Sequence, residues 1–356
     1  MPSAQYVAAL TRDLQQEGAS GRPAGRTIRT VFLGGGTPSL FTGDEVATII
    51  EAVRANFTLD PDAEITLEAN PGTTEYDNLA NYRKAGINRL SLGAQSFDDE
   101  ALKCLGRIHG KAEILAAYED AVAAGFDNIN LDLMFALPGQ TIAAARDDIA
   151  AASALRPAHI SWYQLTLEPN TVFFARPPDK LPDDDEAWDI QQAGQRQLAD
   201  AGYEQYEISA YARDGHRCRH NLNYWSFGDY LAVGAGAHGK FTDSDGGVWR
   251  YQKPAHPRSY MEQVGRADDG ARLLQASDLC FEFMLNALRL RGGFTEEGFC
   301  ERTSLPFDAV RDVVVRARSM QLLTSPGNGR WRPTGRGLRF LNDLQALFLP
   351  AEEGAG

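Results

Sequence analysis

The feature that most constrains the fold is a repeated alternation of short apolar runs with amphipathic segments. The segments between the runs carry apolar residues at helical spacing, as in DEVATIIEAVRANF (44–57), TEYDNLANYRKAG (74–86), KAEILAAYEDAVAAG (111–125) and IAAARDDIAAASAL (142–155). Strands alternating with helices predict a parallel sheet of βα units, either a barrel or a doubly wound sheet. Five runs each end in polar or glycine-rich residues, which favours the barrel, because a barrel collects its strand ends on one face. The runs occupy residues 28–36, 63–71, 88–97, 128–139 and 159–169.

The pattern differs on either side of this repeat. An amphipathic helix is predicted over residues 3–17, and an aromatic-rich, less regular region follows from residue 203 to 260. From Asp278 onward, the helical patterns LCFEFMLNALRL, PFDAVRDVVVRARSM and, last, GRGLRFLNDLQALF surround two apolar pieces separated by the turn SPGNGR, as in a winged-helix-like domain. We therefore expect a barrel domain over 1–202, an extension over 203–275, a C-terminal domain over 276–349 and a tail over 350–356.

Charge and hydropathy limit the partners. The net charge of −13 argues against nucleic acid as the main partner, since phosphate binding needs clustered Lys and Arg. Residues 278–343 hold ten Arg against eight Asp or Glu, which fits a mixed solvated face or, as a weaker alternative, a nucleic-acid module. No stretch is apolar enough to span a bilayer, and no secretory signal pattern opens the chain. We expect a cytoplasmic protein.

The strand ends carry the candidate chemistry. GGGTP (34–38) lets backbone amides approach a ligand, although a lone glycine cluster also fits a tight turn. It matches neither a P-loop nor the G-x-G-x-x-G fingerprint. Glu68, Gln95 and Asp132 offer acceptors for an amino group and ribose hydroxyls, and Arg107 could meet a carboxylate. Together they would suit one ligand with an ammonium, a carboxylate and a ribose.

Seven motifs in order give the chain a resemblance to a known family. VFLGGGTPSL, ITLEANPGT, NRLSLGAQSF, LGRIHG, NLDLMFALPGQT, HISWYQLTLEPNT and HNLNYW resemble the radical S-adenosylmethionine family of oxygen-independent coproporphyrinogen dehydrogenases, and most of all its heme-chaperone branch. The resemblance runs from about Tyr6 to Leu349 and implies a partial (β/α)6 barrel with a helical C-terminal domain. It also implies that the following residues contact S-adenosylmethionine: Gly35, Gly36, Thr37, Glu68, Gln95, Arg107 and Asp132.

HNLNYW (220–225) looks like the heme-associated motif of the chaperone branch. His220 is then the candidate axial ligand of heme iron, since imidazole binds heme iron well, with a structural histidine as the alternative. In HRCRH, the residues His216, Cys218 and His220 alternate, so on a strand they would share a face and could form part of a metal site.

The chain departs from the family in one respect. The family holds a [4Fe-4S] cluster in a C-x3-C-x2-C loop after its first barrel strand, and this sequence has neither. Its four cysteines are Cys104, Cys218, Cys280 and Cys300, which match none of those positions. We therefore assign no catalytic residue and expect no radical chemistry from the chain as written. Either the reading frame upstream of Met1 encodes the missing strand and loop, as the intact remaining set favours, or the chain is a pseudoenzyme.

The resemblance implies a heme chaperone that binds heme and passes it to acceptor hemoproteins, with S-adenosylmethionine and a cluster in the complete protein. The alternative is an oxygen-independent coproporphyrinogen III dehydrogenase, which would make the protein an enzyme of porphyrin synthesis.

Overall fold

The computed structural model describes residues 3–23, 25–71, 79–169, 171–265 and 270–350. Packing divides the chain into two compact units. Unit 1 comprises residues 1–28, 48–61 and 219–356, and unit 2 comprises residues 29–47 and 62–218. This division differs from the boundaries expected after residues 202 and 275, which stay predictions, and most of the tail lies outside the described residues.

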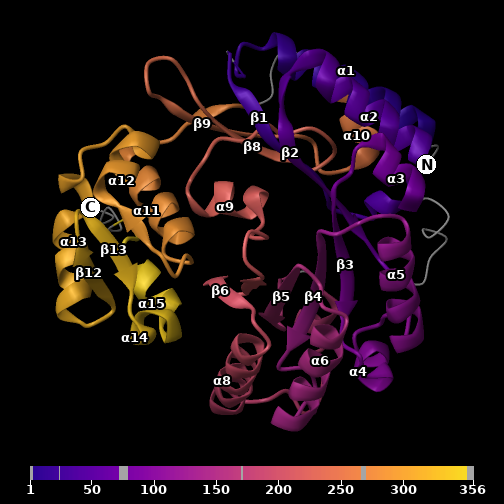
Figure 1. Cartoon of the computed structure of the whole chain (residues 1–356). Helices are drawn as coiled ribbons and strands as arrows, with labels where there is room; N and C mark the ends of the chain where they lie inside the picture. The colour runs from indigo at the N-terminus through magenta and orange to yellow at the C-terminus, as the bar shows by residue number, and fades with distance from the viewer. Residues whose placement is uncertain (1–2, 24, 72–78, 170, 266–269, 351–356) are drawn as a thin grey trace. The chain divides into compact units, whose positions relative to one another are not determined.

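A seven-stranded sheet organises unit 2. The strands β2 to β5 pair in parallel, and β7 runs antiparallel to both β5 and β6. Figure 1 shows β3, β4 and β5 side by side, with α5 and α6 along their outer side. The five predicted strands and the barrel-like α/β class are confirmed. In spatial order the strands are β1 (Thr27–Leu33), β2 (Thr58–Ala69), β3 (Arg89–Gln95), β4 (Ile129–Phe135), β5 (His159–Gln164), β7 (Ala210–Ala212) and β6 (Glu204–Glu207).

Helices connect these strands. The predicted helical segments at 44–57, 111–125 and 142–155 are confirmed, and the segment predicted at 74–86 is helical from Leu79, its earlier part lying outside the described residues. The helices are η1 (Pro38–Leu40), α2 (Gly43–Asn56), α3 (Leu79–Ala85), α4 (Asp99–Cys104), α5 (Lys111–Ala123), α6 (Ile142–Ala154), α7 (Val172–Ala175) and α8 (Asp184–Asp200).

Close packing seals the helix layer onto the sheet. The Trp162 ring of β5 is 1% exposed and lies 4.4 Å from the Phe135 ring, centroid to centroid. A side chain at Gly194 of α8 would place its Cβ 2.0 Å from that indole, so only glycine fits where the helix crosses the ring.

Unit 1 contains more regular structure than its sequence predicts. Three short strands, at 238–242, 248–252 and 272–273, form an antiparallel sheet in the order β10-β9-β8, where the sequence predicts only an irregular aromatic region. These strands were not predicted because they are short and partly polar. Asp229 accepts hydrogen bonds from Lys240 Nζ and Thr242 N, which hold the outer strand. The elements are α1 (Ser3–Ala19), α9 (Arg219–Trp225), β8 (His238–Thr242), β9 (Val248–Gln252), α10 (Pro257–Gln263) and β10 (Arg272–Leu273).

The C-terminal part has the element order of a winged helix, α-β-α-α-β-β, with an antiparallel sheet in the order β11-β13-β12. Phe299 is fully buried, its ring centroid 5.0 Å from that of Phe283. The predicted class is confirmed, but α12 was not predicted, and the predicted last helix is two helices that break at Phe340. The elements are α11 (Ala276–Ala287), β11 (Phe294–Thr295), α12 (Glu296–Thr303), α13 (Asp308–Ser319), β12 (Leu323–Gly327), β13 (Arg330–Pro333), α14 (Gly335–Arg339) and α15 (Leu341–Ala346).

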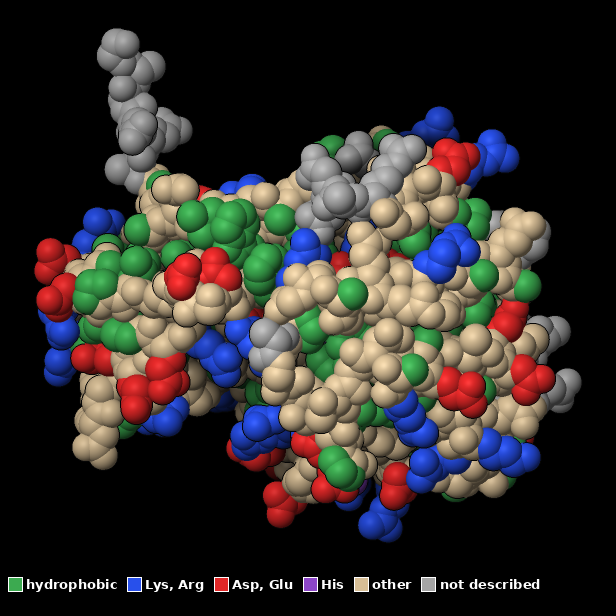
Figure 2. Space-filling model, turned by 90° about the horizontal axis from the view of Figure 1, so that it is seen from above, with side chains coloured by type: hydrophobic (Ala, Val, Ile, Leu, Met, Phe, Trp, Pro, Cys, Tyr) green, Lys and Arg blue, Asp and Glu red, His purple; other side chains and the backbone are tan. Residues whose placement is uncertain are grey.

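The charges of this part are mixed on the surface. Arg311 of α13 pairs with Asp308 at 2.7 Å and approaches Glu296 at 3.9 Å. Figure 2 shows Lys and Arg side chains interspersed with Asp and Glu on the face that it presents, around a gathering of hydrophobic side chains.

Among the described residues, no helix is both long enough and apolar enough to cross a membrane.

Candidate functional site

The glycine turn after β1 meets Glu68 at the end of β2. Gly35 and Gly36 have φ angles of 78° and 62°, a left-handed conformation that glycine adopts without strain. The Gly35 N–H donates to Glu68 Oε2 at 3.0 Å. Burial raises the pKa of Glu68, the Gly35 amide opposes the rise, and the nearby charge of Asp132 adds to it. Thr37 follows directly and is half-buried.

Asp132 on β4 is held from two sides. Ser91 Oγ donates to its Oδ2 at 2.9 Å, and Asn130 Nδ2 donates to its Oδ1 at 2.9 Å. Burial raises the pKa of Asp132, while these two hydrogen bonds and the Arg89 cation work in the opposite direction. The carboxylate is therefore fixed in orientation by neutral donors.

Gln95 ends β3 in an unusual conformation, with a φ of 67° and only 5% of its surface exposed. The β3–β4 pairing shifts register between Leu92 and Gln95, which turns the side chain out of the regular ladder. Its Oε1 accepts a hydrogen bond from the Tyr163 hydroxyl of β5 at 2.8 Å.

Tyr163 ties the predicted residues into one site. Burial raises its pKa to about 12, the charges of Asp132 and Glu68 add to the rise, and the charge of Arg107 opposes it. Hydrogen bonds join the glycine turn to Glu68 and Gln95 to Tyr163. Glu68, Asp132 and Arg107 are charged groups within electrostatic range of the Tyr163 hydroxyl. Sequence reasoning missed Tyr163, although it lies in the fifth apolar run, one residue before that strand ends.

The two carboxylates keep capacity for a cationic ligand. Among the described residues, neither Glu68 nor Asp132 has a Lys or Arg hydrogen-bond partner. Carboxylates that accept only one or two hydrogen bonds each can still accept others, from an ammonium group or from ribose hydroxyls.

A third buried carboxylate hydrogen-bonds the residues that directly follow β3. Asp148 of α6 accepts from the Phe97 N–H at 2.6 Å and from Ser96 Oγ at 2.9 Å, directly after Gln95. Burial raises its pKa to about 6 against these two hydrogen bonds. No sequence pattern indicates this role, because Asp148 lies mid-helix in an alanine-rich segment.

His220 lies apart in sequence from this edge, on α9 of unit 1. Its ring centroid is 4.9 Å from that of Tyr224, which stacks on Tyr230 at 4.2 Å. None of the α9 residues is buried, and His220 is half-exposed. The HNLNYW motif therefore forms a short helix whose aromatic side chains are partly exposed.

The strand on which His216, Cys218 and His220 would share a face, as part of a possible metal site, does not form. Residues 213–218 belong to no strand, and α9 begins at Arg219 because its backbone bonds continue into the helix. Cys218 is buried and its thiol lies 3.6 Å from Glu64 Oε1. Within the described ranges, no three His, Cys, Asp or Glu side chains are grouped to hold a metal ion.

The cysteines do not assemble either. Cys104 is exposed on α4 and Cys218 is buried, while Cys280 and Cys300 are half-buried on α11 and α12. A [4Fe-4S] cluster needs at least three thiolates around one site. The thiols of the described residues do not fit this group.

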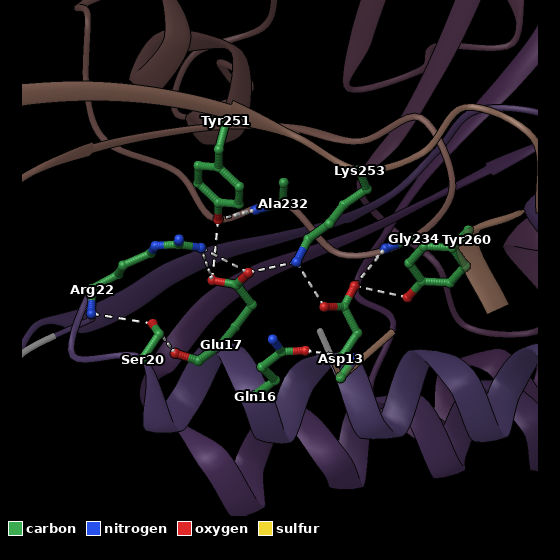
Figure 3. Close-up of polar contacts among 11 residues, drawn as sticks. Asp13, Gln16, Glu17, Ser20, Arg22, Ala232, Gly234, Tyr251, Lys253 and Tyr260 are labelled. Atoms are coloured by element: carbon green, nitrogen blue, oxygen red, sulfur yellow. Dashed lines mark hydrogen bonds and ion pairs between the residues drawn. The ribbon is translucent and has the colours of Figure 1, made fainter. Parts of the chain in front are cut away.

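A second polar cluster lies in unit 1 (Figure 3). Asp13 and Glu17 of α1, each 1% exposed, both bond Lys253 Nζ, at 2.8 and 2.7 Å. Tyr260 donates to Asp13, and Arg22 and Tyr251 donate to Glu17. A cavity of about 520 Å³ touches this cluster, but its charged groups are already paired with each other. The ion pairs of Asp13 and Glu17 with Lys253 therefore join α1 to the chain after β9, and we call these three residues the clasp.

Comparison with known proteins places the chain in a family. Residues 10–152 match the model of the radical SAM superfamily. The chain is 47% identical over 349 residues to the heme chaperone HemW of Escherichia coli, covering 98% of this chain and 91% of that protein. It is 44% identical over 354 residues to HemW of Haemophilus influenzae, covering 99% and 91% of the two chains.

A mouse protein and a solved structure extend the likeness. The mouse mitochondrial radical S-adenosyl methionine domain-containing protein 1 is 38% identical over 338 residues, covering 91% of this chain and 76% of its own. The structure of coproporphyrinogen III oxidase HemN from Escherichia coli superposes with a TM-score of 0.79 at 22% identity, over 97% of this chain and 83% of that one, and so shows a shared fold. The chain belongs to the radical SAM superfamily and, within it, to the HemW family of heme chaperones.

Proposed function

We propose that the chain is a heme chaperone that binds heme and transfers it to acceptor hemoproteins. The observation that carries the proposal is the near-full-length identity to proteins named heme chaperones. Transfer between proteins requires a site from which the cargo can leave, and the half-exposed aromatic side of α9 suits such a site better than a closed cavity. A cytoplasmic location fits this role.

His220 would supply the iron ligand. Its imidazole is half-exposed, and its contact with Tyr224 leaves the ring at the edge of an aromatic stack. Imidazole is a strong axial ligand, and aromatic faces suit the flat apolar porphyrin. The ligand would thus be recognised through its iron as well as through its ring.

The strand ends of unit 2 would bind S-adenosylmethionine. Gly35, Gly36 and Thr37 offer backbone groups in an exposed turn, and Glu68 and Asp132 offer acceptors that no cation occupies within the described part of the chain. When bound, this cofactor supplies a sulfonium that a reduced cluster can cleave. Because the thiols of the described residues do not fit a cluster, we derive no radical step for this chain.

The dehydrogenase alternative has weaker support. The likeness to coproporphyrinogen III oxidase is one of fold at 22% identity, and no residue of this chain is assigned to hydrogen abstraction. The two functions differ in which porphyrin the protein should bind most tightly. A chaperone with an iron ligand prefers iron protoporphyrin, whereas a dehydrogenase would prefer a porphyrin with more carboxylates.

The test is a spectroscopic titration of the chain with hemin, metal-free protoporphyrin and coproporphyrin. We expect hemin to bind at least tenfold more tightly than either metal-free ring, about 1.4 kcal/mol, and to move to an added apo-hemoprotein. His220→Ala should lose that preference and shift the Soret band, because the iron ligand is gone. His238→Ala, an exposed histidine of β8, is the matched control and should behave as the parent. Equal hemin binding in both variants would overturn the assignment of His220, and tightest binding of coproporphyrin would favour the dehydrogenase.

A further inference from the structure

A line of buried hydrogen bonds runs through the sheet of unit 2 and ends at Asp132. His159 on β5 is fully buried, with Nδ1 at 2.6 Å from Asn130 Oδ1 and Nε2 at 2.8 Å from the Tyr206 hydroxyl. Asn130 Nδ2 bonds both Ser91 Oγ, at 2.7 Å, and Asp132 Oδ1. Apart from Asp132, none of these groups was singled out by the sequence.

The direction of every bond in this line follows from its chemistry. Asn130 uses its amide hydrogens toward Ser91 and Asp132, so its oxygen must accept from His159 Nδ1–H. Burial and the Arg89 and His216 charges lower the pKa of His159, so the ring is neutral and Nε2 must accept. The Tyr206 hydroxyl therefore donates to Nε2, and its oxygen accepts from the Cys218 N–H at 3.2 Å.

With His159 neutral, and with Ser161 Oγ also donating to Asn130 Oδ1 at 3.1 Å, only one arrangement of hydrogens satisfies all of these groups. Each donor points toward the strand end, from Tyr206 through His159 and Asn130, and Ser91 adds its own hydroxyl to the second oxygen of Asp132. The opposite tautomer would place two acceptors, His159 Nδ1 and Asn130 Oδ1, face to face, and an imidazolium would be a buried cation near Arg89. Such a mismatch is costly where no water can repair it.

We propose that His159 is a positioning residue, held as the neutral Nδ1–H tautomer so that Asn130 presents its amide hydrogens to Asp132. The inference deepens the proposed function, because it rests on Asp132 as an acceptor for S-adenosylmethionine. Residues far from the ligand would thereby fix the angle at which that carboxylate meets it.

Two variants separate positioning from simple packing. Asparagine at 159 can place an amide donor near the position of Nδ1, toward Asn130, whereas glutamine can reach the position of Nε2, toward Tyr206. Both remove the ring. We expect His159→Asn to bind S-adenosylmethionine within about threefold of the parent, and His159→Gln to bind at least about tenfold more weakly. A packing role alone predicts equal losses in both.

Nitrogen-15 NMR of the histidines tests the inference without any ligand. The parent should show His159 as a neutral Nδ1–H ring between pH 6 and 8, its signals identified by their absence in His159→Asn. Carbon-13 NMR of the aspartates should show a higher pKa for Asp132 in His159→Gln than in His159→Asn, because the Asn130 hydrogen bond weakens.

The outcomes are distinct. An Nε2–H tautomer, an imidazolium, or identical Asp132 titration in the two variants would overturn the positioning role. If the parent bound no S-adenosylmethionine at millimolar concentration while both NMR signatures appeared, the proposed cofactor site would fail and the positioning of Asp132 would stand.

Discussion

At the strand ends of unit 2, Glu68 and Asp132 accept hydrogen bonds from amides and a hydroxyl, whereas in unit 1 Asp13 and Glu17 share the ammonium of Lys253. Both pairs of acids come from elements that also bury apolar side chains. The first pair keeps its charge available to a ligand, while the second is neutralised within the fold.

The pKa directions follow the same division. Burial raises the pKa of Glu68 and of Asp132, and their neutral donors do not fully offset it. In unit 1, burial alone would raise the pKa of Asp229, but the Lys240 ammonium at 2.7 Å and the Thr242 amide hold it below its usual value. A carboxylate kept ready for a cationic ligand costs stability, whereas for one paired with a buried lysine the large cost comes when that lysine is removed.

The largest effect should come from breaking the clasp. Lys253→Met removes the one ammonium that Asp13 and Glu17 share, leaving Asp13 buried with only the neutral partners Tyr260 and Gly234. Removing one partner of a buried ion pair typically costs about 3–5 kcal/mol. We expect a loss of this size in the free energy of unfolding, measured by urea denaturation followed by tryptophan fluorescence.

Lys103→Met is the matched control, since Lys103 pairs with Glu100 on the surface, where the two side chains are 69% and 84% exposed. It should leave the unfolding curve unchanged. Adding Asp13→Asn to Lys253→Met should restore part of the loss, because it removes the unpaired charge. Equal curves for the two lysine variants would contradict the division between the clasp and the surface pairs.

The strand-end carboxylates of unit 2 could be predicted from the sequence, and the Asp13–Glu17–Lys253 cluster of unit 1 could not, for a physical reason. Strand ends are local features, so Glu68 and Asp132 are marked by the apolar runs that precede them. Asp13 lies 240 residues from Lys253, and on α1 it resembles a solvated acid until its partner is known. Its place next to Leu10 and Leu14 on the buried side of the helix was the one available signal.

Tyr163 and His159 illustrate the same limit within one strand. Both lie in the predicted run HISWYQLTLEP, yet their roles depend on pairing with Gln95 and Asn130 of neighbouring strands. Strand order and register decide those contacts, and a single strand's pattern carries neither. The fold class and the carboxylates were therefore predictable, while the groups that orient them were not.

A smaller effect is expected from neutralising the open carboxylate. Glu68→Gln can still accept from Gly35 but carries no charge, so the proposed affinity for the ammonium of S-adenosylmethionine should fall at least about tenfold. Stability should change by less than about 1 kcal/mol, because no cation is left unpaired. Calorimetry should find the parent itself weaker than micromolar, since no cluster chelates the cofactor.

Glu119→Gln on the exposed side of α5 is the matched control for charge and should bind like the parent. Micromolar binding by the parent would contradict the expected dependence on the cluster. Unchanged affinity in Glu68→Gln would remove this carboxylate from the proposed site.

The smallest effect concerns pH and Asp148, the buried acid that bonds only neutral partners and faces the charges of Asp98 and Asp147. Its pKa of about 6 in the folded chain lies above the usual value for an unfolded aspartate, about 3.9. The folded state therefore keeps a proton that the unfolded state releases, and the resulting stabilisation is full below the unfolded pKa value and is lost as pH rises through about 6.

Asp148→Asn cannot ionise, so its free energy of unfolding should gain about 1 kcal/mol relative to the parent between pH 5 and pH 7. Glu68 and Asp132 titrate in both proteins and cancel in this difference. Urea unfolding at several pH values measures it, with Asp120→Asn on the exposed side of α5 as a control that should give a flat difference. A flat difference for Asp148→Asn as well would mean that neutral donors hold this carboxylate as firmly as Lys240 holds Asp229, and the distinction between the two units would fail at this residue.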